Sequence, residues 1–584
     1  MRRTRLVVLL LAAVGTVCSA GARVPRQKLL ERLRQVAEVE IDVMVPMRDG
    51  VRLATDVVRP KGEGKHPVVL LRTPYRKNAL GGAHYARAGY ALVAQDVRGR
   101  YKSEGEHYPF IHDLDDAYDT IAWLAKQPWC DGNVGMTGGS YVGFTQLAAA
   151  MTNPPALRCI QPTVPPSDFD HGTIFQGGAL RMELAQGWLV GQSWRSKRVL
   201  EKRVPADEVQ RMRALGGFRQ WCRHLPLADP GPIAVGGPGY EQCWRDMVGN
   251  WEKPTQWTRA SALQRPEAIH CPVLVQAGFF DIFAQENLDL VLALRARGGS
   301  EATRKHSHLV IGPWVHGIGR PAGELSYPTA RRALQGLSQK WFARWLKGEK
   351  SDVDTWHAIR AYVMGQDRWL ELDTWPPPDS RPTKLYLASG TLSLKAPGAA
   401  GEPSAFTYDP ENPVPTRGGC NLIVPKGVRD HRKLAERGDV VAFVGEPLER
   451  DVVVAGRLRA HLFVSTSAPD TDVTAMLLDV RPDGYRANLA DGIVRLRYRE
   501  GRDKPKLVTP GEIVAVDVDL WSTAYTFKQG HRIALHVSSS NFPRFDRNLN
   551  TAEPPARWTT PRKAENKVHH DPAHASFVEL PVLP

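Results

Sequence analysis

Apolar and polar residues alternate on both sides of an Asp-Gly pair in the run "EVEIDVMVPMRDGVRLATDVVRP", residues 38–60. A period of two places successive side chains on opposite faces of a strand. Asp-Gly is a favoured pair for the tight turn between two antiparallel strands. The pattern therefore predicts a β-hairpin that turns at Asp49 and Gly50.

Near-continuous apolar runs follow the hairpin and alternate with helix-like segments. The apolar runs are "PVVLLRTPY", "YALVAQDVRG", "NVGMTGGS", "LRCIQPTV", "CPVLVQAGFFD" and "HSHLVIGPWVH"; the helix-like segments are "DAYDTIAWLAKQPW", "NLDLVLALRARGG" and the long "RRALQGLSQKWFARWLKGE". Strands that are apolar on both faces are typical of a parallel sheet covered by helices on both sides. We expect this sheet over residues 38–167 and 262–376.

The alternation is interrupted between residues 168 and 261. This stretch is rich in Trp, Arg and Gly and contains helix-compatible segments such as "VPADEVQRMRALGGFRQWCRHL". Ligands of α/β sheets bind at the carboxyl ends of the strands. We therefore expect residues 168–261 to form a helical cap over that edge of the sheet.

The pattern changes again after the proline-rich boundary "DTWPPPDSRP". Short β-rich runs, among them "TKLYLAS", "VAGRLRAHLFVSTS", "DVTAMLLDVRP", "EIVAVDVDLW" and "HRIALHVSSS", are separated by Pro, Gly and Asp turns. Such runs predict a β-sandwich or jelly roll over residues 380–584.

The first 22 residues have the pattern of a secretory signal peptide. A basic start ("MRRTR") precedes an apolar run ("LVVLLLAAVGTV") and a small-residue end ("CSAGA"), as such peptides require. The apolar run is too short to span a bilayer comfortably. We expect cleavage after Ala20 or Ala22, export to the periplasm or the exterior, and no stable membrane insertion afterwards. Cys18 follows Val17, which fits a lipoprotein site poorly.

Composition restricts the function classes. The chain has 584 residues, 42% hydrophobic and 24% charged, so two or three globular domains are expected. The formal charge of +15 is dispersed among 62 acidic residues, whereas nucleic-acid binding proteins cluster their basic residues; we expect no nucleic-acid partner. Oligomeric state stays open.

Six cysteines remain after the signal peptide, and an even number in an exported chain permits disulfides. Cys222 and Cys243 form the first pair to test, and for the other four cysteines buried free thiols fit the sequence at least as well as disulfides. No C-x-x-C spacing occurs, which disfavours a structural zinc site.

Ser140 in "MTGGSYVG" follows a predicted strand and stands among small residues, as a nucleophile elbow requires. A serine nucleophile needs a base and an orienting acid, and α/β-hydrolases carry them after strands in the order Ser, Asp or Glu, His. Asp281 and His316 end the two predicted strands that resume after residue 261, in that order. The three residues together predict a catalytic triad.

The chain resembles a known superfamily through several motifs in succession. These are "TPYRK", "QDVRGRYKSEG", "GNVGMTGGSYVGFTQLAAA", "GFFD", "IGPWVH", "TYDPENPVPTRGG" and "NFPRFDRNLNT". Their order is similar to that of the cocaine esterase / Xaa-Pro dipeptidyl-peptidase / α-amino-acid ester hydrolase superfamily, over about residues 38–560, and nearest to its cocaine-esterase-like branch. The resemblance implies an α/β-hydrolase with an inserted helical cap and a C-terminal jelly roll.

The resemblance also implies roles. Ser140 would be the acylated nucleophile, His316 the general base and acid, and Asp281 the group that orients His316. The backbone N–H of Tyr141 and the hydroxyl of Tyr75 would form the oxyanion hole. No metal or organic cofactor is implied.

One departure bears on the substrate. The amino-acid ester hydrolases hold the substrate ammonium with an acidic pair just beyond the catalytic aspartate, where this chain has Ile282 and Phe283. An apolar wall cannot offset the desolvation of an ammonium group, so a neutral, hydrophobic or aromatic acyl group is favoured. Glu286 follows a few residues later, and Asp168, Asp170 and Glu183 at the start of the cap could still supply negative charge, so an aminopeptidase-like activity stays open.

Three functions follow as hypotheses. The leading one is a serine esterase whose small-molecule substrate contacts Phe169, Phe175, Trp188 and Trp314. The second is an Xaa-Pro dipeptidyl-peptidase or a β-lactam or amide acylase with the same triad. The third is a carbohydrate- or surface-binding protein that uses the jelly roll and keeps an inactive hydrolase scaffold.

Overall fold

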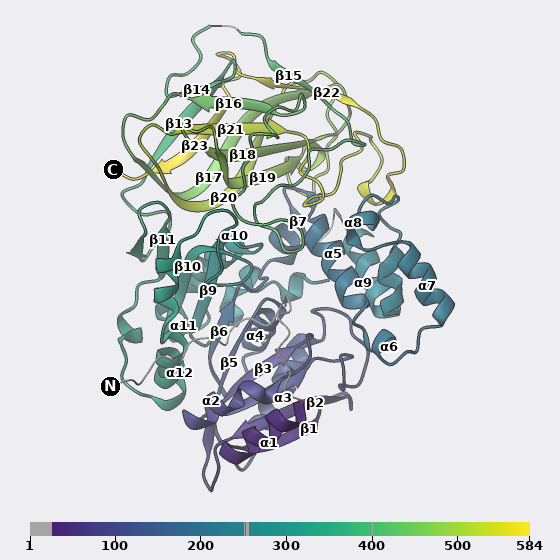
Figure 1. Cartoon of the computed structure of the whole chain (residues 1–584), viewed down its shortest axis with the longest axis vertical. Helices are drawn as coiled ribbons and strands as arrows, with labels where there is room; N and C mark the ends of the chain where they lie inside the picture. Colours follow the sequence, from purple (N-terminus) through teal and green to yellow (C-terminus); the bar gives the residue numbers. More distant parts are fainter. Residues whose placement is uncertain (1–25, 250, 253–255, 400) are drawn as a thin grey trace.

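The computed structural model describes residues 26–249, 251–252, 256–399 and 401–584. The expected signal peptide and Cys18 lie outside these residues. None of the described helices is long and apolar enough to cross a membrane. A ten-stranded sheet lies beneath a strand-rich C-terminal part, and a group of helices lies to one side of both (Figure 1).

The ten-stranded sheet has the order β1-β2-β4-β3-β5-β6-β9-β10-β11-β12. Its strands are β1 (Glu38–Pro46), β2 (Arg52–Arg59), β3 (His66–Thr73), β4 (Ala91–Asp96), β5 (Cys130–Gly139), β6 (Leu157–Thr163), β9 (Val273–Phe280), β10 (Ser307–Val315), β11 (Ile359–Val363) and β12 (Arg368–Leu372). The run from β4 to β11 is parallel, and β1 and β2 pair antiparallel. The hairpin and the buried parallel strands predicted from the sequence are confirmed.

Helices cover both faces of this sheet. They are α1 (Arg26–Val36), α2 (Gly82–Arg87), α3 (Asp113–Ala125), α4 (Tyr141–Met151), α10 (Ala284–Arg297), α11 (Glu301–Lys305) and α12 (Leu337–Lys347). Val273 and Val275 pack in the cluster that holds the apolar residues of α3, α4 and α10. Leu274, between them, packs with those of α2 and α12. The two-residue period of the strand thus sends apolar side chains to both faces.

One predicted helix is shorter than expected. The segment "RRALQGLSQKWFARWLKGE" was expected to be a single long helix, but its first part belongs to a 3₁₀ segment, Pro328–Leu334, and α12 begins only at Leu337. Gly336 stands between them with φ of 71°, a left-handed conformation that interrupts an α-helix.

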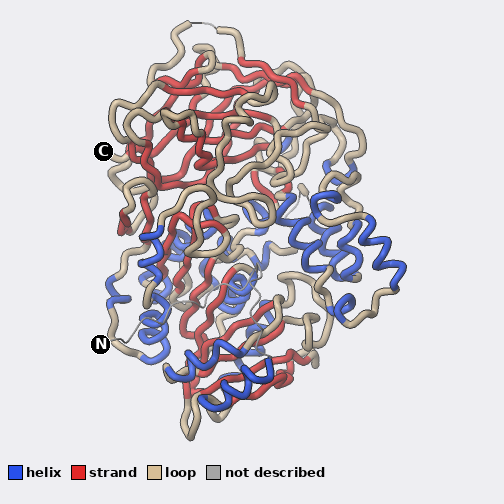
Figure 2. The backbone as a smooth tube through the Cα atoms, viewed as in Figure 1, coloured by secondary structure: helices blue, strands red, loops and turns tan. Residues whose placement is uncertain are grey.

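Residues between β6 and β9 are mainly helical (Figure 2). The helices are α5 (Met182–Ser193), α6 (Lys197–Leu200), α7 (Ala206–Ala214), α8 (Phe218–Trp221) and α9 (Pro238–Gly249); the short strands β7 (Phe175–Gln176) and β8 (Ala179–Leu180) precede them, and a π-helical turn spans Phe169–Thr173. The helix-compatible pattern of this stretch is confirmed.

The C-terminal part consists mainly of strands and the long loops that join them (Figure 2). They are β13 (Arg381–Ala388), β14 (Thr391–Ser393), β15 (Ser404–Tyr408), β16 (Val441–Gly445), β17 (Val452–Thr466), β18 (Asp472–Val480), β19 (Arg486–Arg495), β20 (Val514–Phe527), β21 (Arg532–Ser538), β22 (Ala564–His569) and β23 (Phe577–Val582). The order is β15-β22-β17-β23-β13-β14-β16-β21-β18-β19, with β20 on β17. The β-rich runs singled out in the sequence fall within β13, β17, β18, β20 and β21.

Candidate active site

Ser140 stands in the tight turn between β5 and α4. Its backbone has φ of 60° and ψ of −126°, a strained conformation for a residue with a side chain and one expected of a nucleophile elbow. Its N–H donates to the carbonyl of Thr163, 2.9 Å away, which ties the turn to the end of β6.

The glycines around Ser140 explain the departure from G-x-S-x-G. A Cβ at Gly138, whose φ is 127°, would lie 2.3 Å from Cγ1 of Val142, so Val142 fills the space that Gly138 leaves. A Cβ at Gly143 would lie 3.0 Å from the Thr163 carbonyl oxygen and 3.1 Å from Pro165. Gly143 therefore allows α4 to approach the end of β6, and the late glycine is a requirement of this turn.

Ser140, His316 and Asp281 form a hydrogen-bonded chain. His316 Nε2 lies 3.0 Å from Ser140 Oγ, and His316 Nδ1 lies 2.6 Å from Asp281 Oδ2. Because a carboxylate only accepts, Nδ1 carries the proton and Nε2 is left to accept from the serine hydroxyl. The arrangement can activate a serine nucleophile.

Asp281 is fully buried, and its second oxygen also has a partner. Oδ1 accepts a hydrogen bond from the Phe283 N–H at 2.8 Å, which fixes the rotation of the carboxylate. The ring of Phe283 meets the His316 ring edge to face at 5.8 Å. Phe283 thus restrains two members of the chain.

Tyr75 follows β3 on a loop beside Ser140. Its hydroxyl accepts a hydrogen bond from Trp188 Nε1 at 3.3 Å, which leaves its own hydrogen for donation. Burial raises the pKa of Tyr75, while hydrogen bonds with Trp188 and Ser140 oppose the rise, so the phenol stays protonated. The buried Arg100 donates from Nε to the carbonyl of Pro74 at 2.9 Å and holds this loop.

Tyr141 begins α4, and its backbone N–H has no acceptor among the described residues. Such N–H groups at a helix start favour negative charge. Its buried side chain is anchored, since the hydroxyl donates to Asp113 Oδ2 at 2.6 Å and accepts from Phe110 N–H at 2.8 Å. Burial raises the pKa of both Tyr141 and Asp113.

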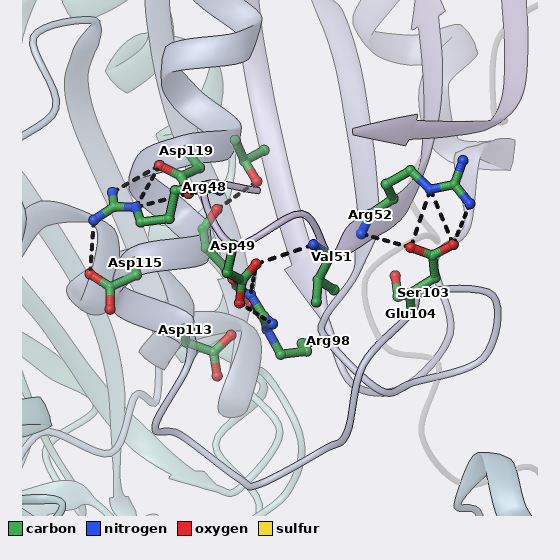
Figure 3. A network of polar contacts seen from close by, with 12 residues as sticks. Arg48, Asp49, Val51, Arg52, Arg98, Ser103, Glu104, Asp113, Asp115 and Asp119 are labelled. Carbon is green, nitrogen blue, oxygen red and sulfur yellow. Dashed lines mark hydrogen bonds and ion pairs between the residues drawn. The ribbon is translucent and has the colours of Figure 1, made fainter. Parts of the chain in front are cut away.

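Asp113 opens α3, whose outer surface is tied to the β1–β2 hairpin. Arg48 contacts Asp119, with Nη2 at 2.8 Å from Oδ1, and also Asp115 (Figure 3). Asp49 accepts from Arg98 at 2.7 Å. These contacts hold the helix that anchors the Tyr141 side chain.

A cavity of about 480 Å³, counted to its open mouth, lies at Ser140. It is lined by Tyr75, Phe110, Ser140, Tyr141, Pro166, Phe169, Thr173, Ile174, Leu184, Ala185, Trp188, Met247, Ile282, Phe283 and Leu422. None of these lining side chains is charged. The walls come from the sheet region, the helical segment and, through Leu422, the C-terminal part.

Only two of the four aromatic residues proposed as substrate contacts lie at the cavity. Phe169 and Trp188 line the cavity, but Phe175 and Trp314 do not, which corrects that part of the prediction. Phe175 lies beyond the π-helical turn and packs on Trp251 and the Arg502 guanidinium. Trp314 lies in β10 and is buried against Trp369 of β12.

Carboxylates near the cavity are engaged elsewhere. Asp168 accepts from the N–H groups of Asp170 and His171 and from Gln264. Asp170 contacts Thr258 and Arg502.

Two further carboxylates hold the backbone of cavity walls. Glu183 accepts from the N–H groups of Leu422 and Ile423, and Glu286 accepts from those of Ser167 and Asp168. Neither Glu183 nor Glu286 lines the cavity.

Several contributors were missed by the sequence reasoning. Asp113 and Phe110 hold Tyr141, and Leu422 reaches the cavity from the C-terminal part. The acid-rich helix start "DLDD" was a signal for Asp113. No local pattern distinguishes Leu422.

Cys222 and Cys243, the first pair to test for a disulfide, are not bonded to each other. All six described cysteines are free and buried, and burial raises the pKa of both Cys222 and Cys243. Within the described part of the chain, no group of three or more His, Cys, Asp or Glu side chains is arranged to hold a metal ion.

Comparisons with known proteins fit this geometry. The profile of the X-Pro dipeptidyl-peptidase (S15) family matches residues 49–318, and that of the X-Pro dipeptidyl-peptidase C-terminal non-catalytic domain matches residues 351–579. Cocaine esterase of Rhodococcus sp. (strain MB1 Bresler) is 37% identical over 578 residues, covering 93% of this chain and 98% of that protein. The chain belongs to the X-Pro dipeptidyl-peptidase family that includes cocaine esterase. It is therefore a serine hydrolase.

Solved structures extend the similarity within the family. An aminopeptidase from a marine sediment Thaumarchaeota archaeon is 27% identical with a TM-score of 0.80, covering 98% of this chain and 100% of that one. An α-amino acid ester hydrolase is 29% identical with a TM-score of 0.77, covering 94% and 96%. The family fold is an α/β-hydrolase followed by a strand-rich, non-catalytic C-terminal domain.

Proposed function

We propose that this serine hydrolase cleaves carboxylic esters of a neutral, hydrophobic or aromatic acid through an acyl-enzyme. The observation that carries the proposal is the absence of any charged side chain among the residues that line the cavity at Ser140. An uncharged, aromatic wall favours an acyl group that brings no charge to be desolvated.

Acylation would begin at Ser140 Oγ, which attacks the ester carbonyl while its proton passes to His316 Nε2. The Nδ1–H bond to Asp281 would stabilise the imidazolium that forms. The carbonyl oxygen becomes an oxyanion and would accept from the Tyr141 N–H and the Tyr75 hydroxyl. Collapse of the tetrahedral intermediate expels the alcohol, which takes the proton from His316 and leaves an acyl-Ser140 ester.

Deacylation would repeat these steps with water as nucleophile. His316 Nε2 takes a proton from the water as it attacks the acyl carbonyl, and the same two donors hold the oxyanion. Ser140 leaves with the proton, and the free carboxylic acid departs.

The acyl pocket would be formed by Phe169 and Trp188 on one side and Ile282 and Phe283 on the other. In this proposal residues 168–261 act as a cap over the strand ends, and residues 380–584 form a jelly roll that adds Leu422. The cavity lining by residues of the 168–261 segment supports the cap, and the eleven-stranded sheet of the C-terminal part supports the jelly roll. We further propose that the mature chain acts on small molecules after export, on the signal-peptide pattern of residues 1–22.

A peptidase that takes an α-amino-acyl group is the second candidate, supported by the names of relatives such as the archaeal aminopeptidase. Its substrate ammonium needs a carboxylate at the cavity. Asp168, Asp170, Glu183 and Glu286 all accept hydrogen bonds from other groups and lie outside the lining, which favours the esterase.

The two candidates are separated by substrate preference. We expect kcat/KM for p-nitrophenyl benzoate to exceed that for glycyl-prolyl p-nitroanilide by at least about 100-fold, since an unpaired buried charge costs several kcal/mol. A preference for the anilide would contradict the esterase proposal. A variant without the nucleophile, Ser140→Ala, corrects both rates for background hydrolysis.

A further inference from the structure

We propose that Arg181 and Glu183 are positioning residues that fix the walls of the cavity and so set its selectivity for large acyl groups. The inference rests on the proposed esterase function and goes on to name what controls the pocket. Arg181 directly precedes α5 and Glu183 lies in its first turn. Each residue is about 1% exposed, and neither lines the cavity.

Arg181 joins two segments of the wall. Its Nη1 donates to the carbonyl of Gly172 at 2.5 Å, and its Nη2 donates to the carbonyl of Ile282 at 2.7 Å. Gly172 directly precedes the lining residues Thr173 and Ile174, and Ile282 itself lines the cavity. The planar guanidinium therefore holds the π-helical turn and the segment after Asp281 at a fixed separation.

Arg181 also reaches the C-terminal domain. Its guanidinium lies over the ring of Trp521 in β20, 5.2 Å from the centroid. Burial lowers the pKa of Arg181 to about 10, so it remains protonated at neutral pH. The charged guanidinium therefore contacts the helical segment at Gly172, the sheet region at Ile282 and the C-terminal domain at Trp521, all beside the cavity.

Glu183 binds a third segment of the cavity wall, residues 422–423 of the C-terminal domain. Its Oε1 accepts from the Leu422 N–H and its Oε2 from the Ile423 N–H, both at 2.8 Å. Neither N–H has another acceptor among the described residues. Leu422 lines the cavity, and Ile423 packs onto Gly187, one turn further along α5. A single buried carboxylate thus holds the 422–423 segment of the C-terminal domain, which carries Leu422 into the pocket.

These contacts act on backbone groups next to the wall rather than on the reacting atoms. Their loss would let Leu422 and the 172–174 turn shift while the hydrogen bonds among Ser140, His316 and Asp281 stay in place. A benzoyl group is larger than an acetyl group and would contact more of the apolar wall, so its binding depends more strongly on where the wall residues lie. Selectivity for large acyl groups is therefore the property that the pair controls.

The test compares p-nitrophenyl benzoate with p-nitrophenyl acetate in full-length Glu183→Gln. The amide keeps the side-chain volume but offers one acceptor where the carboxylate offers two, so one N–H loses its partner. We expect the benzoate-to-acetate ratio of kcat/KM to fall about tenfold, mainly through KM for benzoate, the scale on which a pocket discriminates small changes of shape. The kcat/KM for acetate should stay within about threefold of wild type.

A double-mutant cycle shows whether the effect passes through Leu422. Leu422→Ala should lower the same ratio, and adding Glu183→Gln to it should produce little further change, because coupled residues are not additive. If Glu183→Gln does not fold, Arg181→Lys serves in its place, because a lysine keeps the charge but lacks the guanidinium fork that spans two carbonyls. It should also lower the ratio.

Asp470→Asn is the matched control. Asp470 is a fully buried carboxylate of the C-terminal domain that accepts from the Arg497 N–H at 2.9 Å and lies outside the cavity. Its replacement should lower the melting temperature and leave the ratio unchanged.

Two results would overturn the inference. One is an unchanged ratio in folded Glu183→Gln. The other is a ratio that falls equally in Asp470→Asn, which would make the effect one of general stability. A wild-type enzyme that cleaves neither ester would instead overturn the proposed function.

Discussion

Tyr75 presents a phenol hydrogen to the cavity because the Trp188 indole occupies its acceptor side. We expect Tyr75→Phe to lower kcat for p-nitrophenyl benzoate by about 10²- to 10³-fold, or about 2.7–4 kcal/mol, with little change in KM. The reason is that the donor acts on charge that develops only in the transition state. Steady-state kinetics at saturating ester measures this.

The control for Tyr75→Phe removes a hydroxyl elsewhere. Tyr386 lies in β13 and contacts Phe577 far from the cavity, so Tyr386→Phe should match wild type. Equal kcat values in Tyr75→Phe and wild type would remove Tyr75 from the oxyanion hole.

At the scale of elements, Glu286 ties α10 to the segment that carries Phe169. Its carboxyl accepts from the N–H groups of Ser167 and Asp168 and from the Thr173 hydroxyl. Burial is the largest cause that raises its pKa, to about 8 from an ordinary value of 4.5; the charge of Asp168 adds to the rise, and the backbone hydrogen bonds and Arg181 oppose it.

This raised pKa gives a stability that depends on pH. Between about pH 4.5 and 8 the unfolded chain has released the Glu286 proton while the folded chain still binds it. The unfolded state therefore binds fewer protons, and the contribution of Glu286 to stability falls as pH rises through that window. Glu286→Gln has no such titration. The melting temperature of the variant minus that of wild type should therefore increase from pH 5 to pH 8. Parallel melting curves across that range would contradict the raised pKa.

The elements that carry the candidate triad could be predicted from the sequence, because each residue follows an apolar strand and strand ends are local signals. The proposal that Phe175, as an aromatic residue of the cap, contacts the substrate failed. A π-helical turn at Phe169–Thr173 rotates the chain between Phe169 and Phe175, and no sequence period marks such a turn. The helix expected from residue 331 fails for a similar local reason, the left-handed Gly336.

At the scale of the whole molecule, the cavity is assembled from distant segments, and this part of the site could not be predicted. Leu422 lines the cavity at Ser140 from the C-terminal domain, and Glu183 of α5 accepts a hydrogen bond from its N–H. Contacts between parts of the chain so far apart depend on the tertiary fold. Sequence patterns identified the parts but not the surface on which they meet.

The state of the cysteine thiols is also a property of the whole fold, because burial of each thiol depends on tertiary packing. All six described cysteines are buried and free, so the folded core does not depend on disulfides. We expect a reducing agent to leave the melting temperature unchanged. Native protein should react slowly with a thiol reagent, because burial raises the pKa of each of these thiols, and denatured, unreduced protein should react fully. A melting temperature that falls on reduction would show a disulfide that this structure lacks.

The acyl-enzyme at Ser140 is the central claim, and rapid mixing with excess p-nitrophenyl benzoate tests it most directly. Wild type should release p-nitrophenol in a burst approaching one equivalent per active site if deacylation is slower than acylation. Mass spectrometry of the acid-quenched protein should find the benzoyl group on the peptide that contains Ser140. Ser140→Ala should give neither burst nor adduct. Undiminished turnover by Ser140→Ala, or a benzoyl group on another residue during turnover, would contradict the account.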